Sequence, residues 1–323
     1  MALATERNYQ ASVQKWHGLG KPIHATNVED AITEAGMDWQ ISKHELKTVS
    51  TNPELDGLQL TRHFPIIRED TKVVLGVLGR GYTTIQNKDA LQMFQDVLDT
   101  NEITLEQGGE FDEGRRLWMV SRLPQELKIG PDEIDRHIII NWSHDGSLAL
   151  TAAFVPYLRR RHVALTAPVK GMPMSVAIKH TKNNKERINE SSKMLKKAYN
   201  YFAEASEVFQ RMVDEPFGKE LMGRYLQMLF PDKELVENKD GSQRKNSNES
   251  KRAEIMDIFC EPSDVSETKW AAFTSVADWA DHSRKGRTPD GSNPTELRLE
   301  GIWFGTAAKI KANALEILQN DVI

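Results

Sequence analysis

The chain has 323 residues and more acidic than basic side chains, which gives a formal net charge of −5 at pH 7. This length and composition fit a globular protein and exclude indiscriminate coating of DNA or membranes. No segment reaches the ~18 uninterrupted apolar residues of a membrane span, and the start lacks a basic stretch followed by an apolar run. We therefore expect a cytoplasmic protein with no membrane partner.

Residue types that usually carry catalysis form no recognisable constellation. Cys260 is the only cysteine, which excludes an internal disulfide framework and a thiolate-rich metal site, and we expect it to be a buried apolar filler. The histidines show no metal-binding spacing, and the adjacent Ser143, His144 and Asp145 cannot adopt the geometry of a catalytic triad. We expect no catalytic residues, no cofactor and no bound metal, so the chain is predicted not to be an enzyme.

Acidic residues cluster on two predicted loops, where a divalent ion is conceivable. Acidic surface loops without a metal are far commoner, and we favour that interpretation for both clusters. They comprise Glu110, Asp112 and Glu113 in one loop and Asp132, Glu133 and Asp135 in the other.

The first third of the chain predicts short helices and a hairpin. Residues 27–36 read as a helix that Asn27 can cap, because its side chain can accept from the first free N–H groups. Residues 64–68 and 72–78 are typical of two strands joined by a tight turn. A second helix is predicted over residues 87–100, with Asn87 as its cap.

The middle of the chain is rich in predicted strands. Residues 103–107 and 117–122 predict one antiparallel pair, and residues 136–143 and 147–154 predict another. The second pair flanks Asp145-Gly146, a strong signal for a two-residue turn.

That turn fixes a register for the second pair. The predicted partners are Trp142 with Ala149, Ile140 with Thr151, and Ile139 with Ala152.

Residues 147–185, which we call the basic island, depart most clearly from the average composition. The island has no Asp or Glu, where the rate of the whole chain predicts about six. A basic segment in an acidic protein indicates an anionic partner, and nucleic acid is our first choice. The basic residues of the island that we expect to contact phosphates are Arg159, Arg160, Arg161, Lys170, Lys179 and Lys182.

Two interpretations of the arginine triplet stay open. If residues 157–165 are extended, Tyr157, Arg159 and Arg161 share one side, and Tyr157 can stack on bases. A neighbouring strand would add Arg115 and Arg116 for phosphates and Trp118 for stacking. The alternative is that the arginines bridge acidic neighbours across the sheet, with the candidates Glu106, Glu110 and Glu113.

The last third of the chain is predicted to be helical. A long helix begins near Asn184 and ends before Pro216, and helices follow at residues 251–259, 267–282 and 304–319. A segment near residues 236–250 has little to bury and is predicted to be a mobile loop. We expect an α+β core at residues 1–215, with a twisted antiparallel sheet and a long packed helix, and a helical C-terminal region at residues 216–323.

The order of several motifs resembles the phage/plasmid-related proteins of domain-of-unknown-function family 932, over roughly residues 16–215. The chain departs from the family pattern after Arg161, where it lacks the Cys and Asn that the family carries. The motifs are Trp16-His17-Gly18-Leu19-Gly20, Ala35-Gly36-Met37-Asp38-Trp39, Leu78-Gly79-Arg80-Gly81-Tyr82-Thr83-Thr84-Ile85-Gln86-Asn87, Gly114-Arg115-Arg116-Leu117-Trp118, Ser143-His144-Asp145-Gly146-Ser147 and Ile178-Lys179-His180-Thr181.

The resemblance implies a protein of phages, plasmids or integrated elements in a bacterial host. The predicted layout of sheet and long helix is similar to the core of single-strand annealing proteins that assemble into rings. We therefore expect a single-stranded-DNA-binding protein of annealing type, used in DNA recombination, that acts as a homo-oligomer without nucleotide hydrolysis. The alternative is a structural or protein-interaction protein of a mobile element, for instance in counter-defence, and a metal-dependent nuclease is a third hypothesis.

Overall fold

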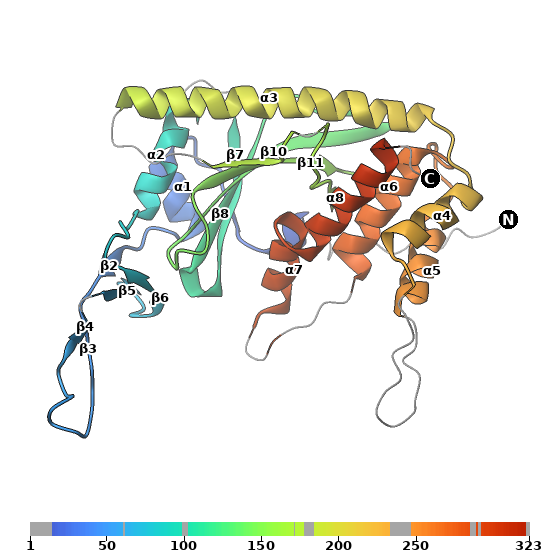
Figure 1. Cartoon of the computed structure of the whole chain (residues 1–323). Coiled ribbons are helices and arrows are strands. Elements are labelled where there is room, and N and C mark those ends of the chain that lie inside the picture. The colour runs from blue at the N-terminus through green and yellow to red at the C-terminus, as the bar shows by residue number, and fades with distance from the viewer. Residues whose placement is uncertain are drawn as a thin grey trace, which may run out of the picture.

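A curled antiparallel sheet forms the centre of the chain in the computed structural model (Figure 1). The structure describes residues 15–60, 62–98, 103–170, 172–177, 184–232, 247–284, 289 and 292–320. The strand order is β1-β7-β8-β10-β11-β12, with β9 paired to β10 and β13 paired to β11. The strands are β1 (Lys21–Pro22), β7 (Thr104–Phe111), β8 (Arg116–Arg122), β9 (Leu127–Ile129), β10 (Asp132–Ser143), β11 (Thr151–Leu158), β12 (Val163–Ala164) and β13 (Ser175–Ala177).

Residues 41–79, which we call the arm, form two small sheets that extend away from the main sheet (Figure 1). The order of the three-stranded sheet is β2-β5-β6, and β3 pairs with β4 at the far end. The strands are β2 (Ile41–Lys43), β3 (Leu46–Lys47), β4 (Gln59–Leu60), β5 (His63–Arg68) and β6 (Val74–Gly79).

Three helices cover one face of the main sheet: α1 (Val28–Ala35), α2 (Asn87–Leu98) and α3 (Asn184–Asp214). Figure 1 shows α3 running along the whole sheet. The ring of Phe154 on β11 lies 5.8 Å from that of Tyr201 on α3, measured between centroids. Gly108 lets β7 approach α1, because a Cβ at this position would lie 2.9 Å from the side chain of Ala35.

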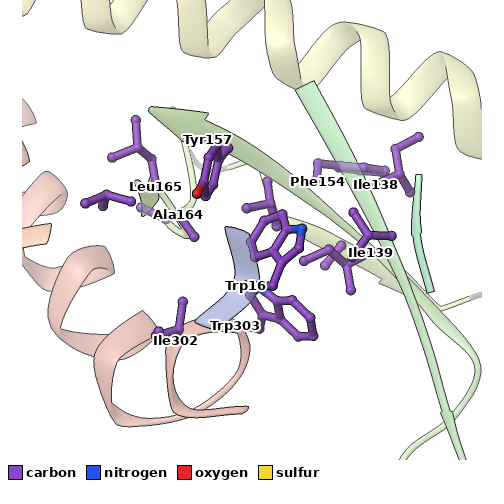
Figure 2. Close-up of a cluster of buried hydrophobic side chains, with 14 of the residues drawn as sticks. Trp16, Ile138, Ile139, Phe154, Tyr157, Ala164, Leu165, Ile302 and Trp303 are labelled. Carbon is purple, nitrogen blue, oxygen red and sulfur yellow. The ribbon is translucent and has the colours of Figure 1, made fainter. Parts of the chain in front are cut away.

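The opposite face packs against the short helix η1 (Lys15–Gly18) and the C-terminal helices through an aromatic cluster. Figure 2 shows Trp16 between Tyr157 and Trp303, and the Trp16 ring lies 4.9 Å from Tyr157 and 5.2 Å from Trp303. The Trp303 ring also lies 5.0 Å from that of Trp118 on β8. Each such ring buries 150–250 Å², roughly, so this cluster contributes strongly to joining the helices and the sheet.

The helical region follows α3 and wraps around the end of the sheet. Its helices are α4 (Lys219–Leu229), α5 (Ser247–Phe259), α6 (Lys269–Asp278), η3 (Trp279–Ser283, a π-helix), α7 (Pro294–Trp303) and α8 (Thr306–Gln319). One further short helix, η2 (Asp112–Gly114), lies earlier in the chain, between β7 and β8.

The α+β class and the helical C-terminal region are confirmed. Asn27 caps α1, since its Oδ1 accepts from the N–H of Asp30 at 2.9 Å. The helix α5 begins at Ser247, so residues 247–250 of the predicted loop are helical, and residues 236–246 lie outside the described residues. Cys260 is exposed, so the prediction that it fills the core is wrong.

The predicted register of the second strand pair is wrong by one residue. β10 and β11 pair Ile140 with Ala152 and Ile139 with Ala153. Pairing with β11 ends at Asn141 and Thr151, so the connection is longer than two residues.

Side chains close this longer connection. The Oγ of Ser143 donates to the carbonyl of Leu148 at 3.1 Å and accepts from its N–H at 2.9 Å. Asp145 Oδ1 accepts from the N–H of Ser147 at 2.8 Å. Gly146 has a positive φ of 76° but Asp145 does not, and a two-residue type I′ turn requires both. The polar side chains therefore favoured a different turn from the one that the dipeptide predicts.

Asn87 opens α2, but its side chain points into the core and does not act as the predicted cap. Its Nδ2 donates to the carbonyl of Met37 at 3.0 Å, and its Oδ1 accepts from Trp142 Nε1 at 3.2 Å. The same oxygen lies 2.8 Å from His144 Nε2. Asn87 therefore joins α2 to β10 and to the segment that precedes β2.

Candidate functional site

The arginine triplet lies on a turn between β11 and β12. Tyr157 pairs with Ala164 and Leu158 with Val163, so residues 159–162 form the connection of a hairpin. His162 has a positive φ of 54° within it. The predicted extended segment is wrong here, and the alternation of sides that it implied does not apply to the arginines.

Arg159 and Arg160 contact the acidic residues around the start of β10. Arg159 Nη2 lies 2.5 Å from Asp135 Oδ1, and its Nη1 lies 2.6 Å from Glu133 Oε2. The hydrogen bonds that Arg159 donates to Asp135 are the main cause that raises the pKa of Arg159. Arg160 Nε lies 2.8 Å from Asp132 Oδ1. Both guanidinium groups therefore form ion pairs with carboxylates of the same chain.

Arg161 is buried and joins the hairpin to the helical region. Its Nη1 lies 2.8 Å from Asp278 Oδ2 on α6, and its carbonyl oxygen lies 3.0 Å from His282 Nε2. Removing one partner of such a buried pair typically destabilises a protein strongly. The role of Arg161 in this structure is therefore to hold α6 against the sheet.

The bridging interpretation of the triplet fits the geometry, although the expected partners were different. Glu106 pairs with Arg122 at 2.7 Å, and Glu110 pairs with Arg68 at 2.8 Å. The acids that contact the triplet lie on β10, just before β9 and in the helical region, too far along the chain for sequence spacing to identify.

The other predicted phosphate ligands that the structure describes also lie in ion pairs. Lys170 contacts Glu204 and Glu207 on α3, the second at 3.1 Å. Arg115 Nη1 lies 3.1 Å from Asp112 Oδ2, and Arg116 contacts Glu300. Lys179 and Lys182 lie outside the described residues.

The two predicted stacking residues belong to the core. Trp118 is 1% exposed and Tyr157 is 4% exposed, and both lie in the aromatic cluster around Trp16 and Trp303. Burial raises the pKa of Tyr157, and its hydroxyl lies 3.2 Å from His162 Nδ1. Neither ring offers a face to a base, so their predicted role does not fit the structure.

Within the part of the chain that the structure describes, no group of three or more metal-ligating side chains comes together. Of the two acidic clusters, the one at residues 132–135 contacts arginines, and Asp112 contacts Arg115. Among the described helices, none is long and apolar enough to cross a membrane.

The arm carries most of the large exposed apolar side chains among the described residues. Two others lie elsewhere, at Leu148 and Met228. Sequence reasoning missed this surface because the exposure of an apolar strand depends on its position in the sheet, which the residue pattern does not show. The exposed apolar residues of the arm are Val49, Leu55, Leu58, Leu60, Val74 and Val77.

Strand β6 is the edge of the three-stranded sheet of the arm. It pairs with β5, and the described residues place no strand on its other side. Its sequence, VLGVLG, contains no charged residue. Val74 is 44% exposed and Val77 is 50% exposed, whereas Leu75 is buried. An uncharged apolar edge is a template for pairing with another strand.

Two basic residues hold the arm to the body of the protein. Arg68 stacks on the ring of Trp39, with its guanidinium carbon 4.1 Å from the centroid, and its Nη1 donates to Glu110 at 2.8 Å. Lys43 Nζ donates to the carbonyls of Arg80 at 2.9 Å and Tyr82 at 2.8 Å. The base of the arm is therefore fixed in one orientation.

A second surface lies on α3, whose first half carries exposed lysines. Lys193, Lys196 and Lys197 are exposed and lie three and four residues apart, so they share one face of the helix. The spacing of these lysines is visible in the sequence, within a helix that the apolar stripe already predicts.

The family model for the domain of unknown function DUF932 matches residues 74–303. Since the match spans more than half of the chain, the protein belongs to this family. The matched segment begins at β6 and ends at α7, so it extends further toward the C-terminus than the resemblance at residues 16–215 implied. Neither the curated proteins nor the solved structures provided a match.

Proposed function

We propose that this protein is a non-enzymatic assembly protein whose copies join through strand β6 of the arm. The observation that carries the proposal is an uncharged, apolar edge strand at the surface of a chain in which 28% of residues are charged. Natural proteins usually protect such an edge with a charge, a proline or a covering segment. The connection at Asp145-Gly146 packs close to Gly76 and Leu78, but no described strand pairs with the outer edge of β6. This open edge supports a role in pairing.

A second copy of the chain is the partner that fits this strand. Two β6 strands that pair antiparallel about a twofold axis place apolar side chains against apolar side chains, and no charges meet. Residues 41–79 contain five Lys or Arg and five Asp or Glu, so the net charge of −5 comes from the rest of the chain. Two neutral arms can therefore approach one another without the repulsion that acts between the bodies.

Pairing of two β6 strands would produce a dimer and not a larger ring. A twofold contact between edge strands is closed, so a larger ring would need a second contact elsewhere on the molecule. The predicted ring accordingly remains a prediction that depends on such a contact.

A substitution on β6 tests the proposed dimer contact directly. Val77→Lys is expected to abolish dimers, because a charge on the exposed face of an edge strand opposes pairing. Sedimentation velocity over a range of protein concentrations measures the effect as a shift from the mass of two chains to that of one. Val49→Lys is the matched control, since Val49 lies on the same arm and is 97% exposed.

The control should sediment like the unchanged protein. A single-chain mass for the unchanged protein at every concentration contradicts the proposal. So does a dimer that Val49→Lys disrupts and Val77→Lys does not.

Single-stranded-DNA binding of annealing type is the second candidate, and the lysine face of α3 is the observation that favours it. Lys193, Lys196 and Lys197 present three positive charges along one helix face, which can neutralise neighbouring phosphates. The resemblance to phage and plasmid proteins gives this activity a plausible setting in DNA recombination. In this candidate function, the lysines of α3 would contact the phosphates in place of the arginine triplet.

Salt dependence tests this candidate. Three phosphate contacts on a single strand predict a slope of about −2 for log affinity against log salt concentration, from ~0.7 per contact. Lys196→Ala with Lys197→Ala should flatten the slope by about 1.4. Arg159→Ala, which removes an intramolecular ion pair, should leave the slope unchanged. Fluorescence anisotropy with a labelled oligo-dT measures all three, and an absence of binding at low salt removes this candidate.

A further inference from the structure

A cavity of about 590 Å³ lies at the junction of η3, α7 and α8. Its volume is within the range of sites for small organic ligands. It is separate from the arm and from the lysine face of α3. The side chains that matter for its chemistry are those of Arg284, Arg298, Glu300, Pro289, Leu297, Phe304 and Thr306.

Arg284 lines this cavity, and its side chain has no hydrogen-bond or ion-pair partner among the described residues. Its Nε is buried without a partner. Its Nη2 lies 3.4 Å from the point that a Cβ on Gly301 would occupy, so the glycine provides room for the guanidinium. Burial, and then the neighbouring charge of Arg298, lower the pKa of Arg284, and the carboxylate of Asp281 partly opposes this shift.

Arg298 adds a second positive charge to the same wall. Its Nη1 donates to the carbonyls of Asp281 and His282, each at 3.0 Å, which fixes the end of η3. Carbonyl groups satisfy its hydrogen bonds but do not neutralise its charge.

Two carboxylates near the arginines, those of Asp281 and Glu300, already have basic partners. Asp281 Oδ1 lies 2.7 Å from Lys311 Nζ, and Glu300 contacts Arg116. Glu296 lines a neighbouring cavity, where its carboxylate accepts from Asp112 N at 3.0 Å and from Asn293 Nδ2 at 3.0 Å. Among the described residues, the carboxylate in the cavity wall, that of Glu300, therefore pairs with Arg116, and neither Arg284 nor Arg298 forms an ion pair of its own.

The other walls suit an organic phosphate. Gly305 caps the 14-residue helix α8 without a side-chain hydrogen bond, so the first N–H groups of the helix and the hydroxyl of Thr306 lie at the cavity. The positive end of a helix favours an anion. Phe304, Leu297 and Pro289 provide an apolar wall for the rest of a ligand.

We propose that this cavity binds the phosphate group of an organic phosphomonoester, with Arg284 as the principal ligand. The phosphate pairs with the guanidinium of Arg284 and accepts hydrogen bonds that this side chain does not make to the described residues. A phosphorylated small molecule and the phosphorylated 5′ end of a nucleic-acid strand present the same chemistry. The inference does not depend on the arm or on strand binding by α3.

Isothermal titration calorimetry with inorganic phosphate, adenosine monophosphate and a 5′-phosphorylated oligo-dT tests the site. We expect the unchanged protein to bind at least one of these probes, and Arg284→Gln to weaken that binding at least about tenfold, since a charged hydrogen bond is lost. Arg224→Gln, on the exposed face of α4, is the matched control and should bind as the unchanged protein does. Tighter binding of the monophosphate indicates a small molecule, and tighter binding of the oligonucleotide indicates a strand end.

Folding of the variant does not obscure the result. Without phosphate, Arg284→Gln is expected to melt at the same temperature as the unchanged protein or higher, because it removes an unpaired charge from a partly buried position. Added phosphate should raise the melting temperature of the unchanged protein but not that of the variant. Equal affinity of both proteins, or no binding of any probe by the unchanged protein, would overturn the proposal.

Discussion

Replacing Lys311 with Met is expected to lower the free energy of unfolding by about 3–5 kcal/mol. Lys311 and Asp281 are both buried, and their Nζ and Oδ1 atoms lie 2.7 Å apart. Lys311 also donates to the carbonyl of Ala164 at 2.6 Å, and Asp281 Oδ2 accepts from the N–H of Ala164 at 3.0 Å. The pair therefore joins α8, η3 and β12, and loss of the lysine leaves a buried carboxylate without its counter-charge.

Urea unfolding measures this effect. Lys309→Met, on the exposed face of the same helix, is the matched control and should change the stability by less than about 0.5 kcal/mol. The double variant Lys311→Met with Asp281→Asn should recover part of the loss, because it removes the unpaired charge. A loss below about 1 kcal/mol in Lys311→Met would show that the pair does not hold the helices to the sheet.

Acid is expected to destabilise the protein between pH 6.5 and about 4 through His144. Burial lowers the pKa of His144 from 6.5 to about 4, and its Nε2 donates to Asn87 Oδ1 at 2.8 Å. The unfolded chain binds a proton in this window and the folded chain does not, so stability is full above pH 6.5 and falls as the pH drops. At 1.36 kcal/mol per pKa unit, the loss approaches about 3 kcal/mol by pH 4.

His144→Gln isolates this contribution, because glutamine can keep a donor to Asn87 but has no proton to gain. Between pH 7 and pH 4, the free energy of unfolding in urea should fall by about 3 kcal/mol more in the unchanged protein than in this variant. The control His63→Gln changes an exposed histidine and should keep the full pH dependence. Equal pH dependence in all three proteins would exclude His144 as the source.

The sequence predicts elements well where local chemistry decides them. Asn27 and Gly36 bound α1 as expected, because a cap and a left-handed glycine act within one turn of the helix. The long helix α3 follows equally from its apolar stripe, which is periodic over many residues.

Register and ion-pair partners depend on contacts that the sequence does not encode locally. Asp145-Gly146 predicted a tight turn, but Ser143 and Asp145 close a longer loop with their own side chains. The arginine triplet predicted an anion-binding strand, but Arg161 pairs with Asp278, which lies 117 residues further along the chain. Composition identified the positive charge of the basic island, and only the fold supplied the carboxylates that neutralise it.

The candidate surfaces were the least predictable part. Val77 belongs to an apolar run that reads as an ordinary buried strand, and its exposure follows from the position of β6 at an edge. Arg284 is one basic residue among many in the sequence. Its interest comes from its side-chain Nε, which is buried without a hydrogen-bond partner among the described residues.

Hydrogen exchange at β6 as a function of protein concentration tests the assembly proposal most directly. The proposal predicts that the amides of Val74–Gly79 become more protected as dimers form, because their outward N–H groups then pair with a second strand. Amides of β10 at the centre of the main sheet should keep the same protection throughout. Dimers that form without any change in protection at β6 would contradict the account, as would an edge whose exchange is independent of concentration.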